Sequence, residues 1–119
     1  MSRLTGFVEK GWGHELIWAT NDQYCGKLLK FTKGRQCSMH FHKDKEETWY
    51  VLDGQFQVVW IDTRDATEKT QLLNPGDIWH NEPLKPHRLI CLEEGTVIEV
   101  STADSIEDNY RIAKGHSQL

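Results

Sequence analysis

Nine short segments rich in β-branched and aromatic residues follow one another along the chain, with turn-forming residues between them. Such segments are typical of strands, because these side chains fit a pleated, half-buried surface. The expected strands are 15–19, 24–32, 36–42, 47–52, 55–62, 70–73, 77–80, 87–92 and 96–101. A series of many short strands predicts an all-β sandwich or closed barrel.

The residues between these segments favour antiparallel pairing. Asp53-Gly54 indicates a tight hairpin, because both residues tolerate the backbone angles that two-residue turns require. No long stretch shows helical periodicity, and only 104–114 is expected to hold a helical turn. The chain has 119 residues and shows no linker or internal repeat, so we expect a single domain over 1–119.

Composition excludes several classes of function. The net charge is -4 and the basic residues are scattered, which argues against nucleic acid as a partner. No apolar stretch is long enough to span a bilayer or to form a leader, so we expect no membrane partner and a cytoplasmic location. Three widely separated cysteines, without a Cys-x-x-Cys pair, predict reduced thiols at Cys25, Cys37 and Cys91.

Two histidines with one residue between them are the strongest chemical signal. Because side chains alternate across a strand, His40 and His42 share one face and their imidazoles can converge on one ion. After a charged turn, Glu47 opens the next strand, which we expect to place its carboxylate beside the histidines across a hairpin. Another strand begins at His87.

The spacing of these residues resembles the motifs of the cupin superfamily. The pattern G-x5-H-x-H-x4-E-x6-G, from Gly34 to Gly54, matches the first cupin motif at every fixed position. The second motif is looser, since Glu82 and Leu84 stand where Pro and Gly are expected before His87. The resemblance implies a cupin barrel, which is a double-stranded β-helix or jelly roll.

The cupin resemblance also implies a metal centre. Its ligands would be His40, His42, Glu47 and His87, and together they would hold one divalent ion. Three imidazoles and one carboxylate suit Zn, Mn, Fe, Ni, Co or Cu, because ligand type alone does not select among these ions.

Motifs outside the ligands resemble the cupin domain of bifunctional, type II mannose-6-phosphate isomerases. The similarity extends from residue 9 to about residue 111, and its motifs are Trp12-Gly13, Tyr24-x-x-Lys27, Glu47-Thr-Trp49, His87-Arg88-Leu89 and Ile98-Glu99-Val100. It implies an aldose–ketose isomerase acting on a sugar or sugar phosphate. Such a reaction needs a metal to polarise oxygens and a base to move a proton between neighbouring carbons.

The resemblance implies roles for six further residues. Glu99 is the first candidate for the catalytic base and His80 the second. The alternative role of Glu99 is to orient a ligand, and that of His80 is as an ordinary loop residue. Trp49 shares a face with Glu47 and would line the pocket. Phosphate anchors would be Lys27, Arg88 and Arg111, but strand alternation places Arg88 on the face opposite His87.

Other interpretations remain open at this stage. The same barrel supports a non-catalytic cupin that binds or senses a small molecule, and an iron-dependent dioxygenase. Trp18 and Trp60 are expected in the core. The apolar row Cys37, Met39 and Phe41 would face outward if the histidines face inward, which calls for a cover and predicts a homodimer.

Overall fold

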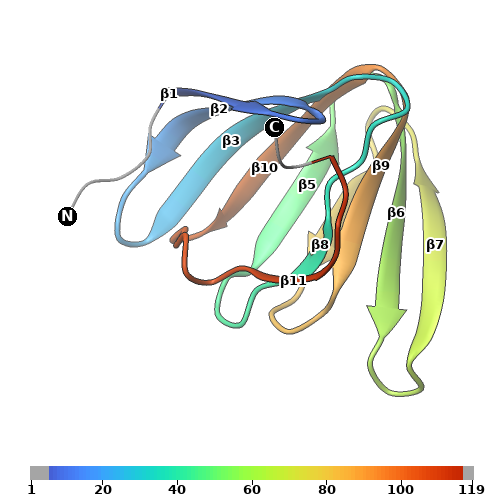
Figure 1. Ribbon diagram of the computed structural model, residues 1–119. Helices are drawn as coiled ribbons and strands as arrows, with labels where there is room; N and C mark the ends of the chain where they lie inside the picture. The colour runs from blue at the N-terminus through green and yellow to red at the C-terminus, as the bar shows by residue number, and fades with distance from the viewer. Residues whose placement is uncertain (1–5, 117–119) are drawn as a thin grey trace.

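Two antiparallel sheets face each other in the computed structural model, which describes residues 6–116 (Figure 1). The first sheet has the order β1 (Gly6–Lys10), β2 (Gly13–Thr20), β3 (Tyr24–Phe31), β10 (Gly95–Thr102), β5 (Glu47–Val51) and β8 (Ile78–Asn81). The second has the order β11 (Tyr110–Ala113), β4 (Met39–Phe41), β9 (His87–Glu93), β6 (Gln55–Asp62) and β7 (Thr67–Leu73). This confirms the predicted all-β jelly roll.

Each of the nine predicted strands overlaps a strand of the structure, while β1 and β11 were not predicted. The helical turn expected within 104–114 is wrong, because Tyr110–Ala113 forms a strand that pairs with β4. Its Tyr110 ring stacks on Phe41 with 5.1 Å between ring centroids. No helix capable of crossing a bilayer occurs in the described residues. Residues 1–5 and 117–119 of the predicted domain lie outside them.

The predicted hairpin at Asp53-Gly54 is also wrong. The two strands that it joins, β5 and β6, lie in different sheets, so the turn carries the chain from one sheet to the other. Gly54 has a φ of 81°. A Cβ at this position would lie 2.7 Å from the carbonyl oxygens of Glu93 and Glu94. Glycine is therefore needed for the turn between β5 and β6 to contact the turn between β9 and β10.

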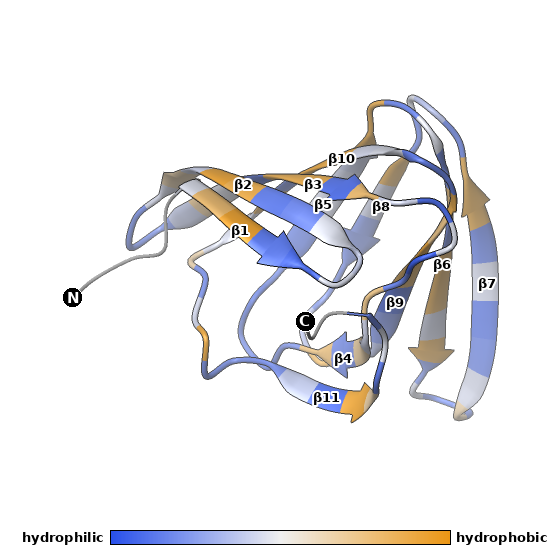
Figure 2. Cartoon of the chain, turned by 45° about the horizontal axis from the view of Figure 1, so that its top comes forward, coloured by the Kyte–Doolittle hydropathy of each residue, from blue (hydrophilic) through white to orange (hydrophobic). Residues whose placement is uncertain are grey.

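The hydrophobic core is formed by buried residues from both sheets. Hydrophobic and hydrophilic residues alternate along several of the strands (Figure 2). Trp12 stacks on Phe31 at 4.1 Å, and Phe31 meets Phe56 edge to face at 5.5 Å. Burying each such large apolar side chain contributes roughly 1.5–3 kcal/mol. The fully buried core side chains include Phe31, Val51, Phe56, Val58, Leu73, Leu89 and Val97.

The cysteines and one tryptophan complete the comparison with the predicted core. All three cysteines are buried and unpaired, as predicted. Trp18, which we expected in the core, is 55% exposed on the outer face of the six-stranded sheet. Its ring lies over Gly26, where a Cβ would come within 2.5 Å of Trp18 Cζ2, so the glycine provides the room that this tryptophan occupies.

The loop before His87 keeps a glycine-like conformation although it carries a leucine. Leu84 has a φ of 67°, a left-handed conformation that L-residues with a Cβ disfavour. Its N–H donates to the carbonyl of His42 at 2.7 Å, which connects this loop to the strand end that carries His42. Leu84 stands where the second cupin motif has glycine, so a residue with a Cβ here adopts a left-handed conformation under backbone strain.

Replacing Leu84 by glycine should stabilise the protein by about 1 kcal/mol, because glycine adopts this φ freely and little apolar burial is lost from a side chain that is 58% exposed. Urea unfolding measures the change. Leu84→Ala is the matched control, since alanine removes the side chain but keeps the strain, and it should not stabilise. Equal stability of the two variants would show that no strain is stored here.

Candidate metal centre

Three imidazoles meet where β4 lies beside β9. His40 belongs to β4 and His42 follows the end of that strand. His87 opens β9, and the antiparallel register places it directly opposite His40. One ligand nitrogen from each ring lies within 4.8 Å of the others. The structure therefore brings together three of the four predicted ligands in a group that suits a metal ion.

The Nδ1 atom of each imidazole contacts a backbone carbonyl. His40 Nδ1 lies 2.8 Å from the carbonyl oxygen of Ser38, His42 Nδ1 lies 2.6 Å from that of Asp108, and His87 Nδ1 lies 2.9 Å from that of Lys85. A carbonyl can only accept a hydrogen bond, so each Nδ1 carries the proton. Each Nε2 then keeps its lone pair, which is the form that ligates a metal.

The environment of His87 tests whether a cation fits here. Its Nε2 is buried and has no hydrogen-bond partner among residues 6–116, although it lies 2.9 Å from Glu47 Oε1. With the proton on Nδ1, a nitrogen lone pair faces a carboxylate oxygen, and two acceptors this close repel each other. A divalent cation would satisfy both atoms together with the other two imidazoles, so the donor set fits a metal ion.

Glu47 approaches the histidines by a route that differs from the predicted one. A hairpin between β4 and β5 is wrong, because these strands lie in opposite sheets and Glu47 faces the histidines across the barrel interior. Its Oε1 accepts from Asn81 Nδ2 at 3.2 Å, and its Oε2 lies 3.3 Å from Lys45 Nζ. Glu47 lies outside the group formed by the three imidazole nitrogens.

Burial and neighbouring charges keep the candidate ligands in their metal-binding forms. Burial, with the nearby His87, lowers the pKa of His40 to about 3, and burial also lowers the pKa of His42. Burial alone would raise the pKa of Glu47, but the adjacent Lys45 ammonium brings it well below its usual value. The result is two neutral imidazoles, those of His40 and His42, beside an ionised carboxylate.

A cavity of about 270 Å³ opens beside these groups. Its apolar wall includes Val8, Trp12, Ile17, Leu29, Phe31, Cys37, Trp49, Leu89 and Ile106. Its polar wall includes Lys10, Glu15, Lys27, Ser38, His40, His42, Lys45, Glu47, Glu99, Asp104, Ser105, Asn109 and Arg111. The candidate metal ligands thus have access to a small-molecule-sized space.

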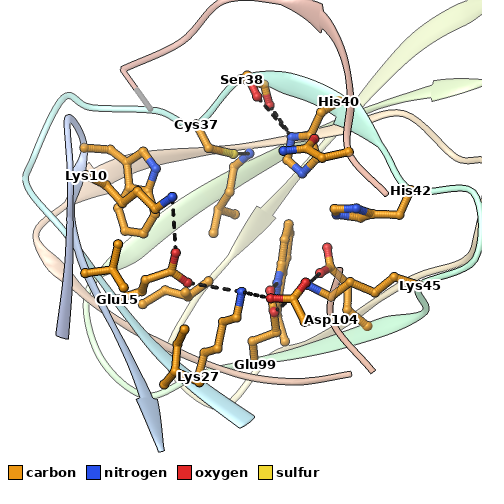
Figure 3. Close-up of a pocket in the computed structure, with 18 of the residues that line it drawn as sticks. Lys10, Glu15, Lys27, Cys37, Ser38, His40, His42, Lys45, Glu99 and Asp104 are labelled. Carbon is orange, nitrogen blue, oxygen red and sulfur yellow. Dashed lines mark hydrogen bonds and ion pairs between the residues drawn. The ribbon is translucent and has the colours of Figure 1, made fainter. Parts of the chain in front are cut away.

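A row of alternating charges crosses one wall of this cavity (Figure 3). It begins with Lys10, which lies 3.3 Å from Glu15, and Glu15 in turn lies 3.2 Å from Lys27. Asp104 then joins Lys27, at 2.9 Å, to Lys45, at 3.4 Å. The row therefore leads through Lys45 to the carboxylate beside the histidines.

Lys45 is a site residue that sequence reasoning missed. Its side chain is only 4% exposed, and its Nζ contacts Glu47, Glu99 and Asp104 within 3.4 Å. Burial would lower its pKa, but these three carboxylates raise it well above the usual value. The charged turn 43–46 gave no signal that one of its lysines points inward, because such a turn is normally solvated.

Glu99, the first candidate for the catalytic base, lines the cavity. Its Oε1 accepts from Trp49 Nε1 at 3.0 Å and its Oε2 accepts from Lys45 Nζ at 3.1 Å. Burial and the charge of Glu47 raise its pKa, against the opposing effect of the lysines. Trp49 is 3% exposed, lines the cavity, and meets the His87 ring edge to face at 5.6 Å.

Two other predicted residues do not line the cavity. His80 lies on the outer side of β8, where it contacts Thr48 Oγ1 at 2.9 Å and Glu46 Oε2 at 2.7 Å. Arg88 donates from Nε to the carbonyl of Cys37 at 3.1 Å and from Nη2 to that of Lys114 at 2.7 Å. Neither is retained as a site residue, whereas the predicted substrate contacts Lys27 and Arg111 do line the cavity.

The apolar row that predicted an outer cover also needs correction. Cys37 lines the cavity and belongs to the core cluster, because the chain is not yet a strand there and strict alternation does not hold. Met39 is buried within the chain, and Phe41 packs on Tyr110 of β11. The C-terminal strand of the same chain thus supplies cover that we expected from a partner.

The pKa of His40 predicts how stability depends on pH without metal. Its folded value of about 3 lies below the usual 6.5, so the unfolded chain binds more protons between these values and stability falls as pH decreases. When the pH is lowered from 7 to 5, the free energy of unfolding of His40→Gln should decrease by about 1 to 2 kcal/mol less than that of the parent chain. Urea unfolding at the two pH values, with a chelator present, measures this difference. The same pH dependence of stability in His40→Gln and the parent chain would refute the prediction.

Comparison with known proteins agrees with this geometry. The family model described as "Cupin domain" matches residues 27–102, which is more than half of the chain. No curated protein sequence matches. Oxalate decarboxylase from Bacillus subtilis is 20% identical, with a TM-score of 0.78 over 91% of this chain and 30% of that one.

Two further solved structures are similar. KdgF from Halomonas sp. is 19% identical, with a TM-score of 0.73 over 85% of this chain and 88% of that one. The oxalate decarboxylase–formate complex of Lactobacillus farciminis is 18% identical, with a TM-score of 0.76 over 91% of this chain and 34% of that one. This chain spans about a third of the decarboxylase chains, and such low identities show the fold alone. The family match and the shared fold together establish that this chain belongs to the cupin domain family.

Proposed function

We propose that this cupin holds one divalent metal ion and catalyses aldose–ketose isomerisation of a small sugar. The observation that carries the proposal is a group of three imidazoles, two of which line the cavity, together with the buried carboxylate of Glu99, which lines the same cavity and has a raised pKa. The ligands would be His40, His42 and His87, with Glu47 as the fourth. Single-domain architecture and a cytoplasmic location remain predictions from the sequence.

The proposed reaction needs two contributions. A bound divalent ion would polarise the carbonyl and hydroxyl oxygens of the sugar. Glu99 would take a proton from the carbon that bears the hydroxyl group and deliver a proton to the former carbonyl carbon, while the hydroxyl proton passes to the former carbonyl oxygen through an enediol, so that the atoms balance without another reactant. Both of its oxygens already accept one hydrogen bond, yet a carboxylate oxygen has two lone-pair sites, so each retains one for the proton.

The charges in the cavity favour an unphosphorylated sugar. Lys10, Lys27 and Lys45 each lie within 3.4 Å of a carboxylate, so a phosphate would have to compete with an existing ion pair. A neutral sugar, whose hydroxyl groups both donate and accept, can bind along the row without breaking any pair. Trp49 and Arg111, which line the cavity from strands of different sheets, would contact the sugar.

The assay uses protein loaded with Mn²⁺, Zn²⁺, Fe²⁺, Co²⁺ or Ni²⁺ and follows sugars by NMR in D₂O. Mn²⁺ is the first choice, because the Bacillus subtilis oxalate decarboxylase has Mn(II) centres. Mannose, fructose and their 6-phosphates are the first substrates. Turnover should be accompanied by deuterium at the carbon that receives the proton. No turnover of any sugar by the loaded protein would reject the isomerase and favour a non-catalytic ligand-binding cupin.

Glu99→Gln should lower turnover by roughly 10²- to 10⁴-fold while metal stoichiometry is retained, because it removes the base but not a proposed ligand. Glu46→Gln is the matched control, since Glu46 is exposed and pairs with His80 outside the cavity. Its turnover should equal that of the parent chain. Unchanged turnover in Glu99→Gln would show that another group moves the proton.

We also propose a homodimer, on a surface different from the predicted one. The outer face of the six-stranded sheet exposes several large apolar side chains, namely Leu16, Trp18, Tyr50, Ile78 and Val100. A second copy would remove these side chains from water. Light scattering should give twice the mass of one chain, and Trp18→Glu should reduce it to one copy. A monomeric parent chain would contradict the dimer.

A further inference from the structure

Asp108, which lies far from the cupin motifs in sequence, contacts the metal centre in two ways. Its side-chain oxygens accept from the backbone N–H groups of Lys43 at 2.6 Å, Asp44 at 3.1 Å and Lys45 at 3.0 Å. Its own carbonyl contacts His42 Nδ1 at 2.6 Å. One residue thus holds both a candidate metal ligand and the turn that follows it.

The turn 43–46 connects two candidate ligands and carries the buried lysine. It runs from His42 to Glu47, and Lys45 projects from it into the cavity. Three consecutive backbone N–H groups directed at one carboxylate form an anion-binding concavity. The conformation of this turn decides where Lys45 points and how Glu47 enters its strand, so the Asp108 carboxylate helps to determine the position of both.

The segment 102–108 holds the rest of this turn as well. Glu46 N donates to Thr102 Oγ1 at 3.0 Å, and Thr102 N donates to the carbonyl of Glu46 at 3.0 Å. Together with the bonds to Asp108, all four N–H groups of the turn are therefore accepted by side chains of this one segment. Asp104 adds an ion pair to Lys45 at 3.4 Å.

We infer that Asp108 is a positioning residue of the metal centre. Its carbonyl keeps the proton of His42 on Nδ1 and orients the ring, while its carboxylate holds the turn that connects His42 to Glu47. The inference rests on the proposed metal site and extends it to the C-terminal segment, which crosses below the barrel and places β11 beside β4 (Figure 2). It also implies reciprocity, because a metal that orders His42 must stabilise the docked segment by the same free energy.

The test compares metal binding by the parent chain with that by Asp108→Ala, Asp108→Asn and the control Asp44→Ala. Asp44 lies on the same turn, is exposed, and uses only its backbone N–H in the bond to Asp108. Titration with Mn²⁺ gives the affinity, and the visible spectrum of bound Co²⁺ reports the ligand geometry. No substrate is needed, so the result does not depend on the isomerase.

Asp108→Ala removes the carboxylate that holds the turn, so the segment whose carbonyl orients His42 is no longer held against it. Metal binding should weaken roughly 10- to 100-fold and the Co²⁺ spectrum should change. Asp108→Asn keeps one acceptor oxygen and should fall between alanine and the parent chain. Asp44→Ala should match the parent in both measurements. Circular dichroism checks that each variant folds. If Asp108→Ala does not fold, the metal affinity and Co²⁺ spectrum of Asp108→Asn decide whether Asp108 positions the metal centre.

The possible failures are distinguishable. A parent chain that binds no metal would overturn the proposed metal centre itself. A parent chain that binds one ion, with the same affinity and Co²⁺ spectrum in folded Asp108 variants, would overturn only the role of Asp108. An equal loss in Asp44→Ala would also overturn it, because the effect would then belong to the turn in general and not to the carboxylate that holds it.

Discussion

The backbone carbonyls that hold the three imidazoles by Nδ1 are the constraint on which the rest of the site depends. They come from Ser38 before β4, from Lys85 before β9 and from Asp108 in the C-terminal segment. Each defines the tautomer and the direction of its ring, so the Nε2 lone pairs converge only if all three segments are in place. The centre is therefore a property of the whole barrel, including parts far from the histidines in sequence.

The second constraint is the burial of charge beside the histidines. In the row that runs from Lys10 to the carboxylates Glu47 and Glu99, three ammonium groups face four carboxylates, so one negative charge lacks a cation within the row. Breaking a buried pair typically costs about 3–5 kcal/mol, because one charge is left uncompensated. The ion pairs of the row hold the Lys45 ammonium between the carboxylates of Glu47 and Glu99. A divalent ion beside Glu47 would supply the missing positive charge.

Sequence reasoning found most of the fold and part of the site. Alternation and turn chemistry located nine strands, because each strand buries one face locally. They could not show that Asp53-Gly54 crosses between sheets, since the glycine is needed for contact with 93–95, about 40 residues away. The same limit explains β11, which exists because Tyr110 and its neighbours pair with β4 and has no strong pattern of its own.

The histidines were predictable because their spacing forms a motif, whereas the residues that orient them were not. Asp108 and Lys45 act through backbone N–H groups, a carbonyl and a buried ammonium, and none of these leaves a signature in the local sequence. Arg88 and His80 show the converse, since family position suggested chemistry for side chains that do not line the cavity. Motif spacing identifies ligands, while tertiary structure identifies what holds them.

The most direct test of this account is ¹⁵N NMR of the six histidine side chains during titration with Zn²⁺. The account predicts Nδ1–H tautomers for His40, His42 and His87 before metal is added. Their Nε2 signals should then shift together and saturate at one equivalent, while His14, His80 and His116 stay unchanged. Nε2–H tautomers in the metal-free protein, or shifts that saturate separately for the three rings, would contradict a single centre built on these imidazoles.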